Sequence, residues 1–159
     1  MTYTPSAQMQ KDMVRREGFS LKVYADSKGL PTIGIGRHHG VNFGDPDITA
    51  ATAYQWLADD LQQGYQDARS LIPDIDNLDL VRREALIDLA FNMGMNTFEQ
   101  FVPFINAVNV RDWPTAHLHL LTNLHLHLTP YLVQTGVRAV DNAGRIATGL
   151  IAKEFRNNV

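Results

Sequence analysis

The sequence predicts a mainly helical α+β fold with one small β-hairpin near the N-terminus. Segments 21–25 and 31–36 have the alternation or composition of strands, and turn-forming residues separate them. Stretches 50–72 and 79–93 instead carry apolar residues at helical spacing. We therefore expect one small sheet, with a short third strand at Val41–Phe43 as an option, and helices through most of the remaining chain.

Length and composition restrict the function classes. The chain of 159 residues can form one or two small domains with a real core, and without cysteine its folding should be independent of disulfides. Its net charge of −3 argues against nucleic acid as the main ligand, because phosphate binding needs clustered Lys and Arg. No apolar run approaches the roughly 18 residues of a membrane span, and the N-terminal residues lack a signal-peptide core. We expect a soluble protein that does not insert into membranes.

The first helix and the hairpin follow each other directly. Apolar Met9, Met13 and Val14 recur at helical spacing within residues 5–17, and Gly18 is a typical helix stop. The hairpin strands then flank the turn-forming sequence Asp-Ser-Lys-Gly at positions 26 to 29. A helix end is thereby predicted to approach a hairpin edge.

Three polar residues lie at this junction. Eight residues separate Glu17 from Asp26, and five more separate Asp26 from Thr32. Taken singly, each residue has an ordinary explanation: Glu17 as a solvated charge, Asp26 as a turn former and Thr32 as a strand residue. Together, two carboxyls in different surroundings can hold different pKa values, so one can act as acid and the other as base. That pairing is typical of glycoside hydrolysis.

The later chain predicts further helices. Thr49 is a suitable N-cap for a helix over 50–72, whose Asp59–Asp60 pair we expect on a solvated face. Residues 79–93 should form a central buried helix that ends at Gly94, and another short helix follows. The apolar residues behind these three predictions are Ala53, Trp56, Leu57 and Leu61, then Leu80, Ala85, Leu86, Leu89, Ala90 and Phe91, then Phe98, Phe101, Val102, Phe104 and Ile105.

The stretch Ala116–Leu128 has an apolar period of two, which by itself indicates a strand. We favour a helix over this stretch, because a lone strand there would have no partner. Its histidines, at 117, 119, 125 and 127, raise a metal hypothesis, but they lack the i, i+4 spacing of helical ligand pairs. The adjacent His38–His39 could also bind a metal, lie in an exposed loop or border a cleft.

The chain resembles the phage-type (T4-like) lysozymes and endolysins over nearly its whole length. The family motif is Glu, eight residues, Asp or Cys, five residues, Thr, and Glu17, Asp26 and Thr32 meet it. Other matching segments are Glu17-Gly18, Leu21-Lys22-Val23-Tyr24, Thr32-Ile-Gly-Ile-Gly36, Leu78-Asp79-Leu80-Val81-Arg82-Arg83, Phe91-Asn92-Met93-Gly94, Trp113 with Ala116, and Gln134-Thr-Gly-Val-Arg138-Ala139. Arg37 departs from the family, which usually has His there.

The resemblance implies a single lysozyme-like domain over 1–159. Its parts would be a β-containing small lobe at about 14–49, a bridging helix at 50–72, and a helical lobe of 73–159 with 1–13. Glu17, Asp26 and Thr32 would be catalytic, and Arg138 would reach back to Glu17. Further residues implied to contact substrate are Phe91, Asn92, Phe104 and His119, the last two by position alone.

The implied activity is that of an N-acetylmuramidase, which hydrolyses peptidoglycan. The resemblance to T4-type members also implies inversion of configuration. The enzyme would need no cofactor or metal, act as a monomer on glycan strands, and lyse bacterial walls. An endolysin of this kind would wait in the host cytoplasm until a separate membrane pore releases it. The alternatives are a lytic transglycosylase and a non-catalytic wall-binding or phage structural module.

Overall fold

The computed structural model describes residues 2–127 and 129–151, with the backbone alone described over 123–127 and 129–136. The chain divides into two compact units, Met1–Gln62 and Gln63–Val159, and each is described by itself. The described elements confirm the predicted α+β class, because helices predominate and the sheet contains two strands. The predicted division into lobes stays a prediction.

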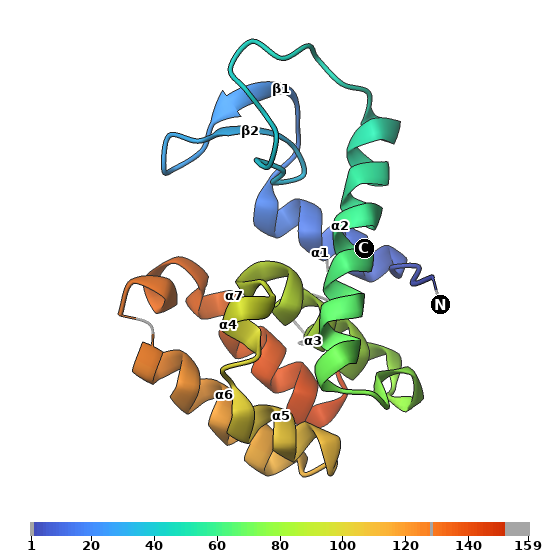
Figure 1. Cartoon of the computed structure of the whole chain (residues 1–159), viewed down its shortest axis with the longest axis vertical. Helices are drawn as coiled ribbons and strands as arrows, with labels where there is room; N and C mark the ends of the chain where they lie inside the picture. Colours follow the sequence, from blue (N-terminus) through green and yellow to red (C-terminus); the bar gives the residue numbers. More distant parts are fainter. Residues whose placement is uncertain (1, 128, 152–159) are drawn as a thin grey trace. The chain divides into compact units, whose positions relative to one another are not determined.

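The first unit contains a helix, a hairpin and the start of a long helix (Figure 1). Helix α1 (Ala7–Glu17) begins at Ser6, whose hydroxyl accepts a hydrogen bond from the backbone N–H of Met9. Strands β1 (Ser20–Ala25) and β2 (Pro31–Gly34) pair antiparallel, with Tyr24 opposite Thr32. The hairpin thus lies where the sequence predicted it.

The segment after β2 is a loop, and the prediction of an optional third strand at Val41–Phe43 was wrong. The backbone N–H of Asn42 donates to the Asp45 carboxylate at 2.8 Å, and the N–H of Asp45 donates to the Asn42 carbonyl at 3.1 Å. These bonds close a local turn, so the Asn42 backbone does not pair with a neighbouring strand.

Helix α2 (Ala50–Leu71) follows the loop and continues past the boundary between the units. The Thr49 hydroxyl accepts from the N–H of Thr52 at 3.1 Å, which confirms the predicted N-cap. Ala53, Leu57 and Leu61 are buried as predicted. The expectation of a solvated Asp59–Asp60 pair was wrong for Asp60, which is half-buried beside Arg37.

The second unit is built from helices around α3 (Leu80–Met93), which follows the short 3-10 turn η1 (Ile75–Asn77). The Asp79 side chain caps α3 by accepting from the N–H of Arg82 at 3.0 Å. Residues 84–90 are all buried, so this helix is central as predicted. Leu80 was expected in its apolar band but is 46% exposed, because it occupies the first turn.

The remaining helices pack on one another within this unit. The single helix predicted from Phe98 to Ile105 is two helices, α4 (Met95–Phe98) and α5 (Val102–Asn109). Pro103 explains the break, because proline is favoured in the first turn of a new helix. Helix α6 (Trp113–His127) confirms the helix in the His-rich stretch, and it packs against α5 and α7 (Thr129–Thr148).

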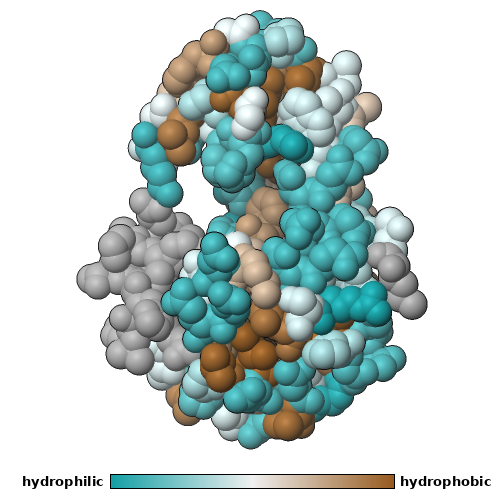
Figure 2. Space-filling model, in the orientation of Figure 1, coloured by the Kyte–Doolittle hydropathy of each residue, from teal (hydrophilic) through white to brown (hydrophobic). Residues whose placement is uncertain are grey.

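The surface carries polar residues among scattered apolar ones, as Figure 2 shows for one face. Exposed apolar side chains occur in both units, for example Phe43 at 63% and Val110 at 76%. No helix in the part of the chain that is described has the length and apolar character needed to cross a membrane.

Candidate active site

Glu17 is the last residue of α1, and its position depends on what surrounds the helix end. Gly18 ends the helix with a φ of 80°, a value that favours glycine, and its N–H donates to the Val14 carbonyl at 2.9 Å. The Glu17 side chain is half-buried and lies against the backbone of Gly36. The carboxyl group therefore extends from a rigid helix end toward the segment that follows β2.

Asp26 begins the turn of the hairpin and is held by backbone hydrogen bonds. Its Oδ1 atom accepts from the N–H groups of Lys28 and Leu30, both at 2.8 Å. The Leu30 bond is the main cause that lowers the pKa of Asp26, and the Lys28 bond and the nearby His38 and Lys28 charges act in the same direction. These hydrogen bonds and charges thus favour the ionised form of Asp26.

Thr32 lies in β2 and is 3% exposed. Its Oγ1 donates to the Leu30 carbonyl at 3.2 Å. The peptide groups of Leu30 therefore contact both predicted site residues of the hairpin, since the Leu30 N–H bonds Asp26 and the Leu30 C=O bonds Thr32. One short backbone segment fixes the carboxylate and the hydroxyl relative to each other.

Tyr24 connects the two carboxyls electrostatically. Burial is the largest cause that raises the pKa of its phenol, and the negative charges of Asp26 and, to a smaller extent, Glu17 raise it further. Both carboxylates therefore act on one neutral phenol that stands opposite Thr32 in the hairpin. Sequence reasoning treated Tyr24 as an ordinary strand residue, although its register opposite Thr32 was the available signal.

Arg37 follows the hairpin and contacts α2. Its Nη1 atom lies 3.5 Å from Oδ1 of Asp60, and its guanidinium lies 5.0 Å from the ring centroid of Trp56. Burial raises the pKa of Asp60, and the Arg37 charge opposes that shift. The neighbouring rings of His38 and His39 are 4.7 Å apart. Among the described residues, no group of three or more potential metal ligands gathers at this pair or elsewhere.

The predicted sugar-contacting residues belong to the second unit. Phe91 and Asn92 are half-buried near the end of α3, and His119 is half-buried in α6. Phe104 is fully buried, with its ring centroid 6.2 Å from that of Phe98, which favours a core role for it. Contact of any of the four with substrate stays a prediction.

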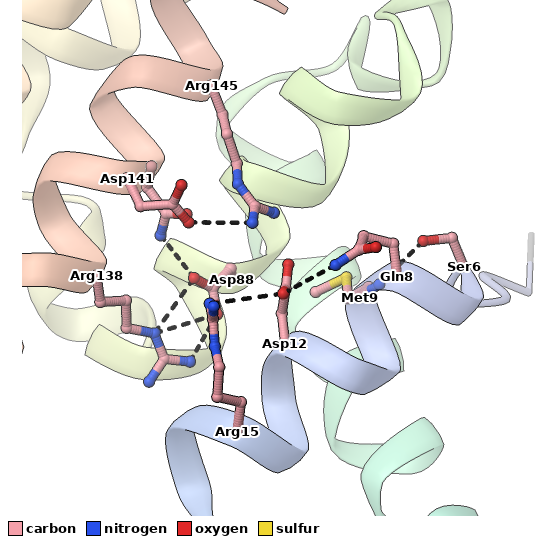
Figure 3. A network of polar contacts seen from close by, with 10 residues as sticks. Ser6, Gln8, Met9, Asp12, Arg15, Asp88, Arg138, Asp141 and Arg145 are labelled. Carbon is pink, nitrogen blue, oxygen red and sulfur yellow. Dashed lines mark hydrogen bonds and ion pairs between the residues drawn. The ribbon is translucent and has the colours of Figure 1, made fainter. Parts of the chain in front are cut away.

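Arg138 lies in a buried polar cluster of the second unit (Figure 3). Its Nη2 atom donates to Oδ1 of Asp88 at 2.6 Å, and the Asn142 amide donates to Oδ2 of Asp88 at 2.6 Å. Asp88 is 2% exposed, and sequence reasoning missed it because its neighbours on α3 are apolar. The expected reach of Arg138 to Glu17 stays a prediction, since these residues belong to different units.

The His-rich helix shows a structural use for one of its histidines. Nδ1 of His117 lies 3.0 Å from the carbonyl oxygen of Ala143 in α7, a hydrogen-bond distance. The side chains of His125 and His127 lie outside the described residues. The bond of His117 explains its place between two packed helices without a metal.

Comparison with known proteins identifies the family. The phage lysozyme family model matches residues 14–123, a range that includes Glu17, Asp26 and Thr32. The chain is 39% identical to an endolysin of Salmonella phage P22 over 89 residues, 53% of this chain and 59% of that protein. It is 32% identical to an endolysin of Acyrthosiphon pisum secondary endosymbiont phage 1 over 104 residues, 64% of this chain and 67% of that protein. It is 27% identical to probable T4-type lysozyme 1 of Dictyostelium discoideum over 146 residues, 76% of this chain and 86% of that protein. With the model covering more than half of its length, this chain belongs to the phage lysozyme family.

Proposed function

We propose that this protein is a peptidoglycan hydrolase that cleaves the β-1,4 bond between N-acetylmuramic acid and N-acetylglucosamine. The observation that supports the proposal is the position of the two carboxyls in one compact unit, where Glu17 ends α1 and Asp26 begins the turn of the hairpin that directly follows. Family membership and the names of the endolysin relatives support the same activity.

Glu17 acts as the general acid in this proposal. Its carboxyl extends from the end of α1, half-buried against Gly36, and it would protonate the glycosidic oxygen of the leaving sugar. The proton must return from water after each turnover.

Asp26 acts as the general base, and Thr32 positions the attacking water. The lowered pKa of Asp26 keeps it ionised, so it can accept a proton as water attacks the anomeric carbon. Its Oδ2 atom is not used by the two turn hydrogen bonds, which both end on Oδ1. The Leu30 peptide fixes Thr32 beside this carboxylate.

Inversion of configuration is the stereochemical outcome we propose. An inverting pair of carboxyls is separated by roughly 6.5–9.5 Å, which leaves room for a water, whereas a retaining pair is separated by about 5–5.5 Å. The resemblance to T4-type lysozymes, which implies inversion, supports this outcome.

The proposed partner is the glycan strand alone. Phe91, Asn92 and His119 would contact its sugars, and Arg138 would orient Glu17. The reaction needs no cofactor, and the protein would act as a monomer. As an endolysin it would stay in the host cytoplasm until a separate membrane pore gave it access to the wall.

The test is digestion of purified peptidoglycan with mass spectrometry of the products. The parent should release fragments with reducing ends, and Glu17→Gln should lose nearly all turnover while keeping its circular dichroism spectrum. Glu99→Gln is the matched control, because Glu99 is an exposed carboxyl in the second unit. Products with 1,6-anhydro ends would instead identify a lytic transglycosylase, and binding without cleavage would identify a wall-binding module.

A further inference from the structure

We propose that the turn formed by residues 33–37 is a positioning device for Glu17, in which Gly36 sets the place of the carboxyl and Arg37 holds Gly36. The inference rests on the proposed role of Glu17 as the acid and names the residues that position it. Gly36 and Arg37 are positioning residues, since neither is assigned contact with the substrate.

The turn is internally closed. The N–H of Ile33 donates to the Arg37 carbonyl at 2.9 Å, and the N–H of Arg37 donates to the Ile33 carbonyl at 3.1 Å. Ile33 and Ile35 are 2% and 3% exposed, so their side chains anchor the turn in the core of the first unit. Gly36 has a φ of 73°, which an L-residue adopts only at a cost.

Gly36 contacts Glu17 so closely that no side chain fits between them. A Cβ atom placed on Gly36 would lie 2.8 Å from Cβ and 3.0 Å from Oε2 of Glu17. Non-bonded carbon atoms are optimally separated by about 3.5–4.0 Å, so such a substitution must displace the glutamate or the turn. The Gly36 backbone is therefore a wall that limits where the carboxyl can lie.

Gly40 offers a comparison with the same positive φ and a different environment. Its φ is also 73°, but no atom lies within 4 Å of a Cβ placed there. Alanine at Gly40 therefore has the same left-handed backbone cost as alanine at Gly36, without the collision with Glu17. The difference between the two alanine variants isolates the displacement of the acid.

Arg37 fixes the turn to the neighbouring helix. It lies 3.5 Å from Asp60 and stacks over Trp56 at 5.0 Å, and both partners belong to α2. Because Arg37 follows Gly36 directly and pairs back to Ile33, restraining its side chain also restrains the Gly36 backbone. Helix α2 thereby stabilises the position of a residue at the end of α1.

The chemical reason for such a device is the geometry of proton transfer. A general acid must lie within hydrogen-bond reach of the atom it protonates, and a displacement of about 1 Å can cost on the order of 10²-fold in rate. A glutamate at a helix end has several rotatable bonds. A wall beside it removes conformers that would point the carboxyl away from the glycosidic oxygen.

The experiment compares Gly36→Ala, Gly40→Ala and the parent on soluble glycan strands from purified peptidoglycan. We expect Gly36→Ala to lower kcat by roughly 10²-fold with KM nearly unchanged, because the acid is misplaced and not the sugar. Gly40→Ala should lose similar thermal stability and keep kcat. Equal values of kcat in the two folded alanine variants would overturn the inference.

A second readout does not depend on activity. In the parent, NMR should show a nuclear Overhauser contact between the Glu17 side-chain protons and the Gly36 α protons, and Gly36→Ala should shift the Glu17 side-chain signals while Gly40→Ala leaves them in place. If the parent cuts no peptidoglycan, the proposed function fails, and the NMR result still decides the positioning. Unshifted Glu17 signals in Gly36→Ala would refute the positioning even in an active parent.

If Gly36→Ala does not fold, Arg37→Ala tests whether the turn positions Glu17. It leaves Gly36 in place and removes the attachment to α2, so kcat should fall on the order of tenfold with KM nearly constant. Asp59→Ala is its control, because Asp59 is an exposed residue of α2, the helix to which Arg37 attaches. An Arg37→Ala variant that keeps both the parent kcat and the Glu17–Gly36 Overhauser contact would contradict the role assigned to Arg37.

Discussion

At the scale of single residues, the backbone of Leu30 organises the hairpin side of the site. Its N–H stabilises the Asp26 carboxylate, and its carbonyl accepts from the Thr32 hydroxyl. A residue with no chemistry of its own thus places two polar side chains. The hydroxyl and the carboxylate can then be tested separately, each by a change that leaves Leu30 intact.

The pH dependence should report the lowered pKa of Asp26. A base must be deprotonated to act, so the rate should fall on the acid side only as the pH drops through this lowered pKa, below the ordinary range of an aspartate. The same shift contributes stability above the unfolded-state pKa, and that stability is lost as the pH falls through the folded-state pKa. A pH profile of kcat/KM measures the fall in rate, and a ¹³C NMR titration of Asp26 measures its pKa. An acid limb above the ordinary pKa range of an aspartate would contradict the assignment of Asp26 as the base.

The hydroxyl of Thr32 is tested by two substitutions of similar size. Thr32→Ser keeps the hydroxyl and should retain kcat within a few-fold. Thr32→Val replaces the hydroxyl with a methyl group at a position that is 3% exposed, and kcat should fall by about 10²-fold because the water is no longer positioned. Steady-state kinetics on glycan strands measure the difference. Equal losses in the two variants would show that shape matters there and not the hydroxyl.

At the scale of elements, local signals predicted more than tertiary ones did. The cap at Thr49 and the hairpin turn after Ala25 followed from local sequence, whereas the helix at 113–127 was predicted against its local apolar period, because a lone strand would lack a partner. The third strand and the continuous helix from Phe98 failed, because a side-chain turn at Asn42 and the break before Pro103 compete with the apolar pattern. The buried Asp88–Arg138 ion pair could not be predicted, since its two residues lie 50 positions apart in the sequence.

The cap of α3 gives a prediction for stability. Asp79 accepts from the Arg82 N–H and lies 2.6 Å from the Arg82 guanidinium, so Asp79→Ala should lower the free energy of unfolding by about 1 kcal/mol. Burial raises the pKa of Asp79, but the bonds to Arg82 outweigh it and the pKa is lowered. The deficit of the variant should therefore shrink as the pH falls through that pKa. Urea unfolding at neutral and acid pH measures this, and a constant deficit would contradict it.

The contact between α3 and α7 depends on a buried ion pair. Asp88 and Arg138 have side chains that are 2% and 10% exposed, and Asn142 shares the same carboxylate. Asp88→Leu should lower the free energy of unfolding by about 3–5 kcal/mol, because it leaves a buried guanidinium without this charge partner. Asp59→Leu, at an exposed position, is the control. Denaturant titration of both variants measures the free energy of unfolding. Similar losses in the two variants would contradict the stabilising role of the buried Asp88–Arg138 pair.

At the scale of the whole molecule, the proposed chemistry is concentrated in one unit. Glu17, Asp26, Thr32 and Gly36 all belong to Met1–Gln62, whereas the predicted sugar-contacting residues belong to Gln63–Val159. The motif residues Glu17, Asp26 and Thr32 lie at a helix end and in the hairpin, and their catalytic roles stay predictions. The suggestion of Phe104 came from position alone; Phe104 is fully buried, and its contact with substrate stays a prediction.

The net charge predicts an unusual response to salt. A chain of charge −3 is not attracted to an anionic wall at long range, so screening should leave the rate of wall lysis unchanged or increase it. The clearing rate of permeabilised Gram-negative cells over a series of ionic strengths measures this. A steep fall in rate with added salt would reveal a local basic surface that dominates wall binding.

The most direct test of the account is proton NMR of purified glycan strands immediately after the protein is added. Hydrolysis by Glu17 and Asp26 with inversion predicts new reducing ends that form first as the α anomer and then mutarotate, and it predicts none from Glu17→Gln. Reducing ends that form first as the β anomer would contradict inversion, and an unchanged rate in a folded Glu17→Gln variant would contradict the central role of this glutamate.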